Sequence, residues 1–342
     1  MSLKNLNATI KIPKVLLKKL DNKTIKQIYK KFEKDLNLKQ NFIVAVSGGP
    51  DSMALAFLAK IYAIKKRLIS KFFIVDHKIR KNSSQEAKFV KKILNSMGIV
   101  AHILVWKGKK PSKNIQSLAR NKRYELLFNK CEKLKCKNIL LGHHQDDLME
   151  NFFLRILRGS GLKGLISLDR KTEIKKINLH RPLLHQKKEN LTYISKNVFG
   201  FYVEDPSNQN EKFQRIKIRN LIKELKKNGL DKKKFLNTIR NLKYSDSAIN
   251  FYVDKNLREN TFFFEKKNEY IINKKFFQQA HEIVFRSLST VLQMIGGKYY
   301  SARGKKVDLL IDNIKNNKLS KFTLGGCIIK ICQETVIITK EY

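Results

Sequence analysis

In the first half of the chain, short apolar runs alternate with longer stretches in which apolar residues recur at helical spacing. The apolar runs, each bounded by turn or charged residues, are 42–46, 72–75, 100–105 and 139–141. The helical stretches that separate and follow them are 53–66, 84–97, 114–134 and 145–157. Strand–helix alternation of this kind predicts an α/β fold, a parallel twisted sheet with helices on both faces.

The strand ends locate the expected ligand site. In open parallel sheets, ligands bind beyond the carboxyl ends of the strands. The segments at those ends are 47–52, 76–80, 106–110 and 142–147. We therefore expect the functional residues to lie on this one rim of the sheet.

The pattern outside the predicted sheet divides the chain further. The predicted domains are a lysine-rich N-terminal helical extension, the sheet domain, a helical domain and a small C-terminal α/β domain, at residues 1–40, 41–225, 226–295 and 296–342. Within the sheet domain, the alternation gives way to loops and short helices after about residue 165. The phenylalanine run 262–264 is expected to be helical, and two strand-like runs, 326–331 and 335–339, end the chain.

Charge is the dominant feature of the composition. The 342 residues contain 72 Lys and Arg against 29 Asp and Glu, a formal net charge of +43. Such a field attracts polyanions, nucleic acids first among them, although drift in an AT-rich genome also explains abundant lysine. No apolar run approaches the roughly 20 residues of a membrane span, and the N-terminus lacks the apolar core of a secretion signal. Four cysteines do not form a disulfide framework in so long a chain, so a cytoplasmic protein is expected.

A glycine- and serine-rich segment, Ser47-Gly48-Gly49-Pro50-Asp51-Ser52, follows the first predicted strand and opens a helix. The glycines allow the backbone to approach an oxyanion closely, and the helix N-terminus offers N–H groups and a positive dipole. The segment lacks the Gly-Lys-Ser/Thr ending of a Walker A loop. It therefore favours pyrophosphate over a γ-phosphate held by lysine, and Asp51 is the candidate ligand for Mg²⁺.

A second polar segment, residues 142–151, begins at the fourth strand end. Helical spacing puts Asp147, Glu150 and Asn151 on one face, with His143 just before the helix. The opposite face is expected to be buried and carries Leu148, Met149, Phe152, Phe153, Ile156 and Leu157. Two carboxylates directed into a cleft can hold an ammonium group and later accept its proton, whereas a solvated helix face is the alternative. Metal binding by the histidines is less favoured, because adjacent side chains point apart.

Both segments resemble those of a known family. Ser-Gly-Gly-x-Asp-Ser at 47–52 resembles the loop of the PP-loop ATP pyrophosphatases, which cleave ATP to AMP and pyrophosphate. His-His-x-Asp-Asp-x-x-Glu at 143–150, followed by Arg-Gly-Ser-Gly-x-x-Gly-Leu at 158–165, resembles the tRNA(Ile)-lysidine synthetases. Further family-like segments are Val75-Asp76-His77 with Arg80, Ala119-Arg120 with Arg123-Tyr124, Arg181-Pro182-Leu183-Leu184, Asp205-Pro206-Ser207-Asn208 and Thr323-Leu324-Gly325-Gly326-Cys327.

The resemblance implies a carbon–nitrogen ligase that joins free L-lysine to the wobble cytidine of the isoleucine tRNA with a CAU anticodon. ATP, with Mg²⁺, adenylates the carbonyl oxygen of the base, and the ε-amino group of lysine then displaces AMP to leave lysidine. The codon that is read changes from AUG to AUA. The resemblance is also compatible with a homodimer.

Roles for individual residues follow from the same resemblance. The ATP-binding set is Ser47, Gly48, Gly49, Pro50, Asp51, Ser52, Asp76 and His77. The catalytic set is Asp51 near Mg²⁺, Asp147 and Glu150 for the lysine substrate, His143 and Arg123. The tRNA-contacting set is Arg181, Arg215 and Arg219. Two positions depart from the family: Asn151 replaces the usual Thr, and Ile216 replaces the usual Asn after Arg215.

Two other functions remain open. Another adenylating PP-loop enzyme that modifies tRNA has the same nucleotide loop, although a thiolating relative is disfavoured because the chain has no Cys-x-x-Cys. The cysteine pairs stand five residues apart, project in different directions on a helix or strand, and are expected to be buried and inert: Cys131 with Cys136, and Cys327 with Cys332. A basic RNA-binding protein without activity is disfavoured by Asp51, Asp147 and Glu150.

Overall fold

The chain folds into two compact units, Met1–Gly229 and Leu230–Tyr342. The computed structural model describes residues 14–79, 82–108, 115–204, 214–298, 302–316 and 320–341. The predicted extension and sheet domain together lie in the first unit. The predicted helical and C-terminal domains, apart from residues 226–229, together form the second.

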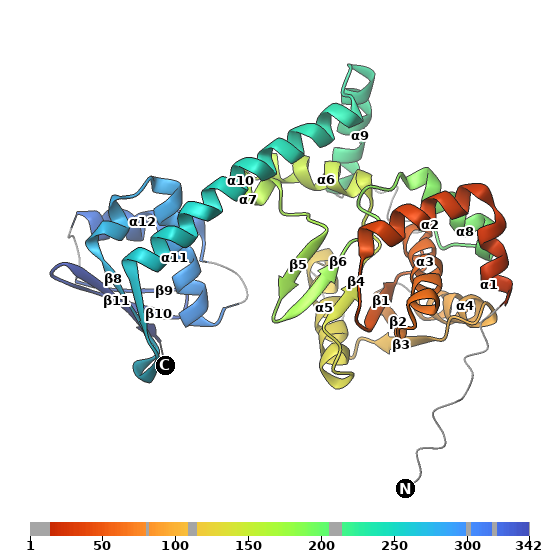
Figure 1. Cartoon of the computed structure of the whole chain (residues 1–342), viewed down its shortest axis with the longest axis horizontal. Helices are drawn as coiled ribbons and strands as arrows, with labels where there is room; N and C mark the ends of the chain where they lie inside the picture. Colours follow the sequence, from red (N-terminus) through yellow and green to blue (C-terminus); the bar gives the residue numbers. More distant parts are fainter. Residues whose placement is uncertain are drawn as a thin grey trace, which may run out of the picture. The chain divides into compact units, whose positions relative to one another are not determined.

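Six strands form the sheet of the first unit (Figure 1). They are β1 (Phe42–Val46), β2 (Ser70–Asp76), β3 (Ala101–Val105), β4 (Asn138–Leu140), β5 (Lys171–Ile174) and β6 (Ile177–His180). Their order is β3-β2-β1-β4-β6-β5, and all pairs are parallel except β5 with β6. The predicted α/β fold with a parallel sheet is confirmed. The strand order changes direction at β1 and β4, where such folds place the ligand crevice.

β5 and β6 form a hairpin where the sequence predicts loops and short helices, so that part of the prediction is wrong. The hairpin turns at Lys175 and Lys176, whose φ angles of 49° and 62° are left-handed. Turns of this kind are usually marked by Asn-Gly or Asp-Gly, and a Lys-Lys turn therefore gives no sequence signal. β6 pairs with β4 and extends the parallel sheet beyond the four predicted strands.

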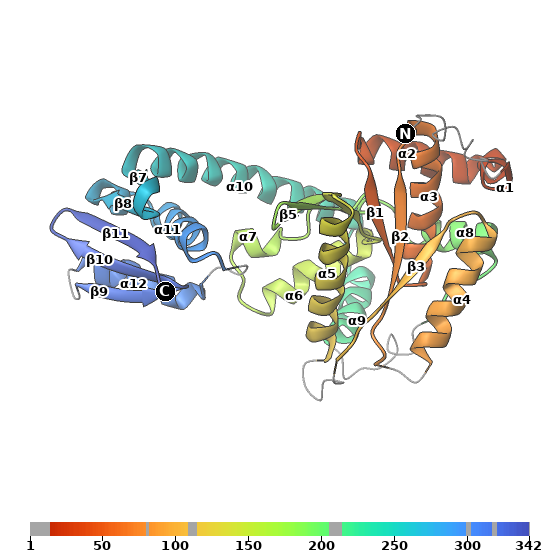
Figure 2. The same ribbon diagram turned by 90° about the horizontal axis from the view of Figure 1, so that it is seen from below.

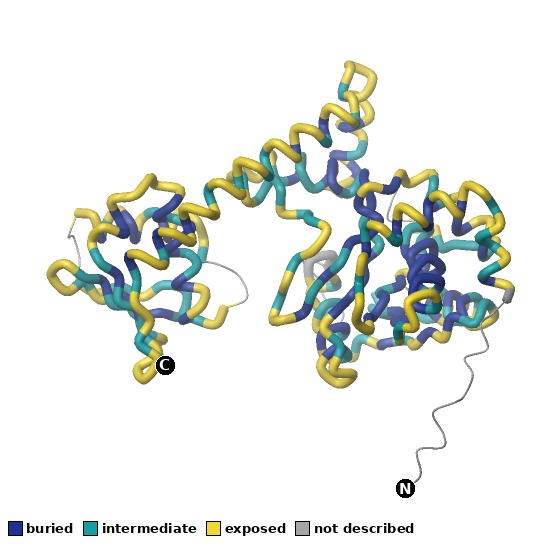
Figure 3. The backbone as a smooth tube through the Cα atoms, viewed as in Figure 1, coloured by how far each residue is buried: buried dark blue, intermediate teal, exposed yellow. Residues whose placement is uncertain are grey.

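Helices cover both faces of this sheet (Figures 1 and 2). One face carries α2 (Lys23–Leu36), α3 (Pro50–Lys66), α4 (Ser83–Ser96) and α8 (Lys188–Phe199), which share a core with β1, β2 and β3. The other face carries α5 (Ile115–Lys133), which packs on β1, β2 and β4. α3 is the most enclosed helix, with every side chain from Ser52 to Ala59 buried (Figure 3).

The N-terminal segment belongs to the same core. α1 (Lys14–Lys18) and the short 3-10 helix η2 (Lys19–Asp21) lead into α2. Ile25, Tyr29 and Phe32 of α2 are buried with the residues of α3. The helix of the extension therefore packs on the sheet domain, because burial of its apolar face joins it to the first unit.

One helix begins just beyond the carboxyl end of β4, and two further helices pack against it. They are α6 (Gln145–Ile156), α7 (Leu162–Leu165) and α9 (Gln214–Lys227), and α9 packs against α6. The predicted apolar stripe of α6 is buried at Leu148 and Met149, but Ile156 is 46% and Leu157 61% exposed. The prediction of burial is wrong at this end of the stripe, because the helix ends at Ile156 and the chain turns at Gly159, whose φ is 62°.

The second unit is a helix-covered antiparallel sheet. Its elements are α10 (Lys232–Asn260), β7 (Thr261–Phe264), η4 (Glu265–Lys267), β8 (Glu269–Asn273), η5 (Lys274–Gln278), α11 (His281–Gly296), α12 (Gly304–Lys315), β9 (Lys321–Leu324), β10 (Cys327–Cys332) and β11 (Thr335–Lys340). The strand order is β7-β8-β11-β10-β9. β7 and β8 lie in the region predicted to be helical, which is a further correction.

The second unit has one core, which explains why the chain does not divide near residue 295. Val284 and Leu288 of α11 pack together with Ile311 of α12 and with Ile329 and Ile338 of the sheet. β8 also pairs with β11, so residues from both predicted domains share one sheet. None of the helices in the described part of the chain has both the length and the apolar character that crossing a bilayer requires.

Candidate active site

The glycine- and serine-rich loop connects β1 to α3. Gly48 has a left-handed φ of 89°, and Gly49 is the N-cap of α3, with Pro50 as its first residue. The Ser52 hydroxyl donates to the Gly49 carbonyl at 2.9 Å and accepts the Ser47 backbone N–H at 3.1 Å. These bonds hold the loop on the N-terminus of α3, where first-turn N–H groups and the helix dipole favour an anion.

Glycine is required at two close approaches around this loop. A Cβ on Gly48 would lie 2.7 Å from Val90 Cγ2 and 3.0 Å from Val203 Cγ2. A Cβ on Gly142, just beyond β4, would lie 3.2 to 3.3 Å from backbone atoms of Asp51 and Ser52. The end of β4 therefore meets the start of α3 without room for a side chain between them.

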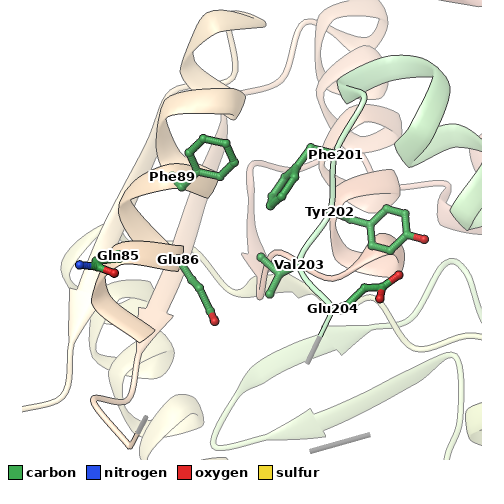
Figure 4. A pocket seen from close by; sticks show the side chains of 7 residues that line it. All are labelled: Gln85, Glu86, Phe89, Phe201, Tyr202, Val203 and Glu204. Atoms are coloured by element: carbon green, nitrogen blue, oxygen red, sulfur yellow. The ribbon is translucent and has the colours of Figure 1, made fainter. Parts of the chain in front are cut away.

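A cavity of about 560 Å³ lies beside the loop (Figure 4). Its lining residues are Gln85, Glu86, Phe89, Phe201, Tyr202, Val203 and Glu204. The rings of Phe89 and Phe201 meet edge to face, with centroids 4.8 Å apart. The Val203 N–H donates to the Gly48 carbonyl at 2.9 Å. The segment that follows α8 thus supports the loop from the side of this cavity.

α6 begins at Gln145, as the sequence predicts, and His144 is its N-cap. His144 Nδ1 accepts the Asp146 N–H at 3.2 Å, and Asp147 Oδ2 accepts the His144 N–H at 2.9 Å. This reciprocal arrangement is a capping box in which histidine takes the usual place of Ser or Thr. The capping box fixes the Asp147 carboxylate at the N-terminus of α6.

The loop and the start of α6 converge on the His144 ring. Its Nε2 lies 3.5 Å from Asp51 Oδ2 and 3.6 Å from Asp147 Oδ2. Burial raises the pKa of Asp51, although His144 opposes the shift. Burial acts in the same direction on Asp147, but His144, His143 and the hydrogen bond from the His144 N–H together lower its pKa. The predicted ATP-site and lysine-site carboxylates therefore both lie within 3.6 Å of one imidazole nitrogen.

Glu150 forms an ion pair with Arg219 of α9. Arg219 Nε donates to Oε1 at 2.6 Å, and Nη2 donates to Oε2 at 3.4 Å. The Glu150 side chain is buried, and that of Arg219 is 33% exposed. The sequence predicts Arg219 as a tRNA contact, whereas the structure places its guanidinium on a buried carboxylate of the same site.

Several basic side chains of the first unit carry buried nitrogen atoms without hydrogen-bond partners. Within the described residues, Arg123 Nε, His77 Nδ1 and His143 Nδ1 are buried without a hydrogen-bond partner. Burial lowers the pKa of His143 to about 3 despite Asp147, and the cations Arg181 and Arg123 add to the shift. Burial and then Arg123 lower the pKa of His77. A half-buried guanidinium whose Nε is enclosed without a partner suits an anionic ligand.

One of the predicted tRNA-contacting residues, Arg181, is engaged inside the protein. Arg181 is buried, and its Nη1 donates to the Asp169 carbonyl and to Thr172 Oγ1, both at 2.8 Å. This position does not suit the predicted contact with tRNA, and it ties the end of β6 to the β5 side of the hairpin. Arg215, by contrast, is exposed on α9.

Asp76 holds the turn between β2 and α4. Its carboxylate accepts the Lys78 N–H at 2.9 Å and the hydroxyls of Ser83 and Ser84 at 2.9 and 2.5 Å. Burial alone would raise its pKa, but these hydrogen bonds lower it. Asp76 ends β2 and His77 follows it at the predicted rim, while Arg80 and the segment 205–208 lie outside the described residues.

The Cys131–Cys136 pair differs from its prediction. α5 ends at Lys133 and Lys135 is left-handed, so the chain turns back and the Cys136 N–H donates to the Cys131 carbonyl at 2.9 Å. A hydrogen bond from Cys131 lowers the pKa of Cys136 to about 7. The expectation that these thiols point apart is wrong because the helix ends between them, and Cys332 is exposed rather than buried.

Comparison with known proteins agrees with this geometry. A family model described as a PP-loop domain matches residues 18–225. The U34-tRNA thiolase NcsA from Methanococcus maripaludis has a similar fold, with a TM-score of 0.56 and 19% identity over 65% of this chain and 78% of that one. The glycine-rich loop at the end of β1 and the parallel sheet thus define a PP-loop protein.

Two curated relatives narrow the class. The tRNA(Ile)-lysidine synthase of Rickettsia felis is 32% identical over 326 residues, which cover 92% of this chain and 74% of the relative. That of Wolbachia sp. subsp. Brugia malayi is 32% identical over 87% of this chain and 70% of its own. The chain belongs to the tRNA(Ile)-lysidine synthase family.

Sequence reasoning missed two features of the site. It assigned no role to His144, although a polar residue before the helix with Asp147 three residues later is the pattern of a capping box. It also missed the pairing of Glu150 with Arg219, which has no local signal because α9 lies far along the chain from α6.

Proposed function

We propose that this chain forms lysidine in the isoleucine tRNA with a CAU anticodon, so that the tRNA reads AUA instead of AUG. ATP would adenylate the wobble cytidine, and free L-lysine would then displace AMP. The observation that carries the proposal is the convergence of the ATP-type loop and the Asp147 carboxylate on His144. The two proposed steps need both groups at one crevice, because the adenylated base has to stay in place for the amine.

In the first step, the base carbonyl oxygen would bond to the α-phosphorus of ATP as the bond to pyrophosphate breaks. The N-terminus of α3 supports binding of the phosphates, and the Ser47 and Ser52 hydroxyls hold the loop in place through their own hydrogen bonds. Arg123, half-buried with its Nε enclosed and unpaired, supports stabilisation of the charge that develops on them.

Magnesium would be held at Asp51. Its Oδ1 is buried without a hydrogen-bond partner, and no group of three or more His, Cys, Asp or Glu in the described segments is placed to hold a metal by itself. The single carboxylate of Asp51 fits Mg²⁺, which commonly takes one or two carboxylates together with substrate phosphates. Once bound, the ion would neutralise charge on the departing pyrophosphate.

In the second step, the lysine ε-ammonium group, whose reference pKa is about 10.4, would have to pass a proton to one of the site carboxylates, Asp147 or Glu150, as it attacks. The lowered pKa of Asp147 keeps its carboxylate charged to attract the ammonium group. The amine nitrogen would then bond to the base carbon, and the bond from that carbon to the AMP oxygen would break. Glu150, fixed by Arg219, would orient the lysine.

The tRNA contact is assigned to Arg215, which is exposed, within a chain whose net charge of +43 favours a polyanion. We place the reaction in the cytoplasm, where its tRNA, ATP and lysine occur. The homodimer stays a prediction that sedimentation analysis tests.

The deciding experiment is incorporation of labelled lysine into a CAU-anticodon isoleucine tRNA transcript, with ATP and Mg²⁺. The methionine tRNA is the matched control, since it carries the same anticodon. Selective labelling with release of AMP is expected. Release of AMP that needs tRNA but transfers no lysine would indicate another adenylating enzyme of the class, and the absence of both would indicate an RNA-binding protein without activity.

A further inference from the structure

We infer that His144 is a positioning residue that holds Asp51 of the ATP loop and Asp147 of the lysine site in a fixed position relative to each other, and so couples the two chemical steps. The inference rests on the proposed function. The two carboxylates come from different elements, the first turn of α3 and the first turn of α6. Their mutual position therefore depends on what lies between them.

The hydrogen bonds of the His144 ring indicate where its proton lies. The ring is buried, and Nδ1 accepts the Asp146 N–H at 3.2 Å. In a neutral imidazole one nitrogen accepts and the other donates, so the N–H is on Nε2. That atom lies 3.5 Å from Asp51 Oδ2 and 3.6 Å from Asp147 Oδ2. One N–H dipole thus stands between two carboxylate oxygens.

Such a dipole has a physical task in this position. Two carboxylates that approach a common buried point repel each other. An N–H within 3.6 Å of both oxygens opposes the repulsion and favours their staying near one ring. The backbone also constrains them, because Gly142 packs directly against the first turn of α3. If the ring is lost, Asp51 and Asp147 are expected to move apart while the fold remains.

The second task of His144, capping α6, can be separated from the first by substitution. Asparagine is among the best N-cap residues, because its side-chain oxygen accepts a first-turn N–H. Its side chain is shorter than that of histidine and ends at a single amide group. His144→Asn is therefore expected to keep the helix cap while it removes the contact with both carboxylates, and His144→Ala removes both.

The experiment measures kcat and KM for lysidine formation by the full chain, together with thermal unfolding. We expect His144→Asn to lower kcat about 100-fold, the size of loss that misplacement of reacting groups by about 1 Å produces. The KM for tRNA and the Tm are expected to stay near the wild-type values. His144→Ala is expected to lose as much activity and also to lower the Tm. His281→Asn, at a 59% exposed histidine on α11, is the matched control and is expected to change neither.

A double-mutant cycle separates positioning from a merely structural role. If His144 acts through Asp147, the loss caused by His144→Asn shrinks to a few-fold when Asp147 is already Asn, because groups that act together are not additive. Full additivity, or wild-type kcat in His144→Asn, would overturn the inference while leaving the proposed function intact. A wild-type chain that forms no lysidine would overturn the proposed function, and the inference with it.

Discussion

Arg219 and Glu150 join α9 to α6 through a guanidinium–carboxylate contact in which Nε and Oε1 are 2.6 Å apart. The carboxylate is buried and the guanidinium is partly exposed. A buried carboxylate depends on its charge partner, because burial without one is costly. The pair therefore fixes both the packing of α9 and the electrostatics of the proposed lysine site.

Arg219→Ala is expected to lower the free energy of unfolding by about 2 kcal/mol, less than for a fully enclosed pair because the arginine is partly exposed. Denaturant unfolding measures this, with exposed Arg215→Ala as the control expected to change stability little. In tRNA binding the pattern is expected to be reversed, with the larger effect in Arg215→Ala. Arg215→Ala is expected to reduce the dependence of log K for tRNA on log salt concentration by the amount due to about one phosphate contact, and Arg219→Ala is expected to leave it unchanged. A stable Arg219→Ala protein with a reduced salt slope would instead mark Arg219 as a phosphate contact.

The two proposed steps are expected to separate by mutation. Asp51→Ala should abolish formation of AMP, because the nucleotide site loses its carboxylate. Glu150→Gln should leave adenylation within a few-fold of wild type and slow lysine transfer by at least about 100-fold, since its carboxylate is proposed to serve only the second step. Rapid-quench measurement of pyrophosphate and lysidine in one reaction distinguishes the steps. Equal loss of both steps in Glu150→Gln would contradict this division.

Gly48→Ala is expected to destabilise the protein and abolish ATP binding. The left-handed φ of 89° disfavours a side chain, and the new Cβ would lie 2.7 Å from Val90 Cγ2. We expect a loss of about 1 to 3 kcal/mol, the range for strained backbone positions. Thermal unfolding and equilibrium binding of ATP measure the two effects. Gly200→Ala, at a left-handed glycine with no atom near its Cβ position, is the control that carries backbone strain without the clash, and it is expected to bind ATP normally.

Stability is expected to fall as the pH is lowered from about 6.5 to about 4. Burial, with Lys171 and Arg181, lowers the pKa of His180 to about 4. The unfolded chain takes up the proton near the reference pKa of about 6.5, whereas the folded chain stays neutral, so protonation favours unfolding across that interval. The expected contribution is about 2 kcal/mol. His180→Gln retains a polar group near Asn138 but cannot titrate, and its Tm is expected to fall less steeply. An unchanged pH profile would rule out this contribution.

The sequence by itself determined the α/β class, the carboxyl-end rim and the chemistry of the loop. These features are local. Strand and helix periodicities depend on residues close together in the sequence, and a glycine-rich turn that opens a helix forms an anion-binding site from its own backbone N–H groups. The start of α6 at Gln145 was predictable for the same reason. The resemblance carried by segments 47–52 and 143–150 then identified the family.

Tertiary structure alone decided which groups meet. Glu150 and Arg219 are 69 residues apart in sequence, and His144 reaches Asp51 only because Gly142 lets β4 pack against the start of α3. The Lys175–Lys176 hairpin turn and the β8–β11 pairing could likewise not be predicted from the sequence, because neither has a typical turn sequence or a hydrophobic periodicity that requires it. Contacts of this kind depend on the packing of whole elements, and local patterns do not encode that packing.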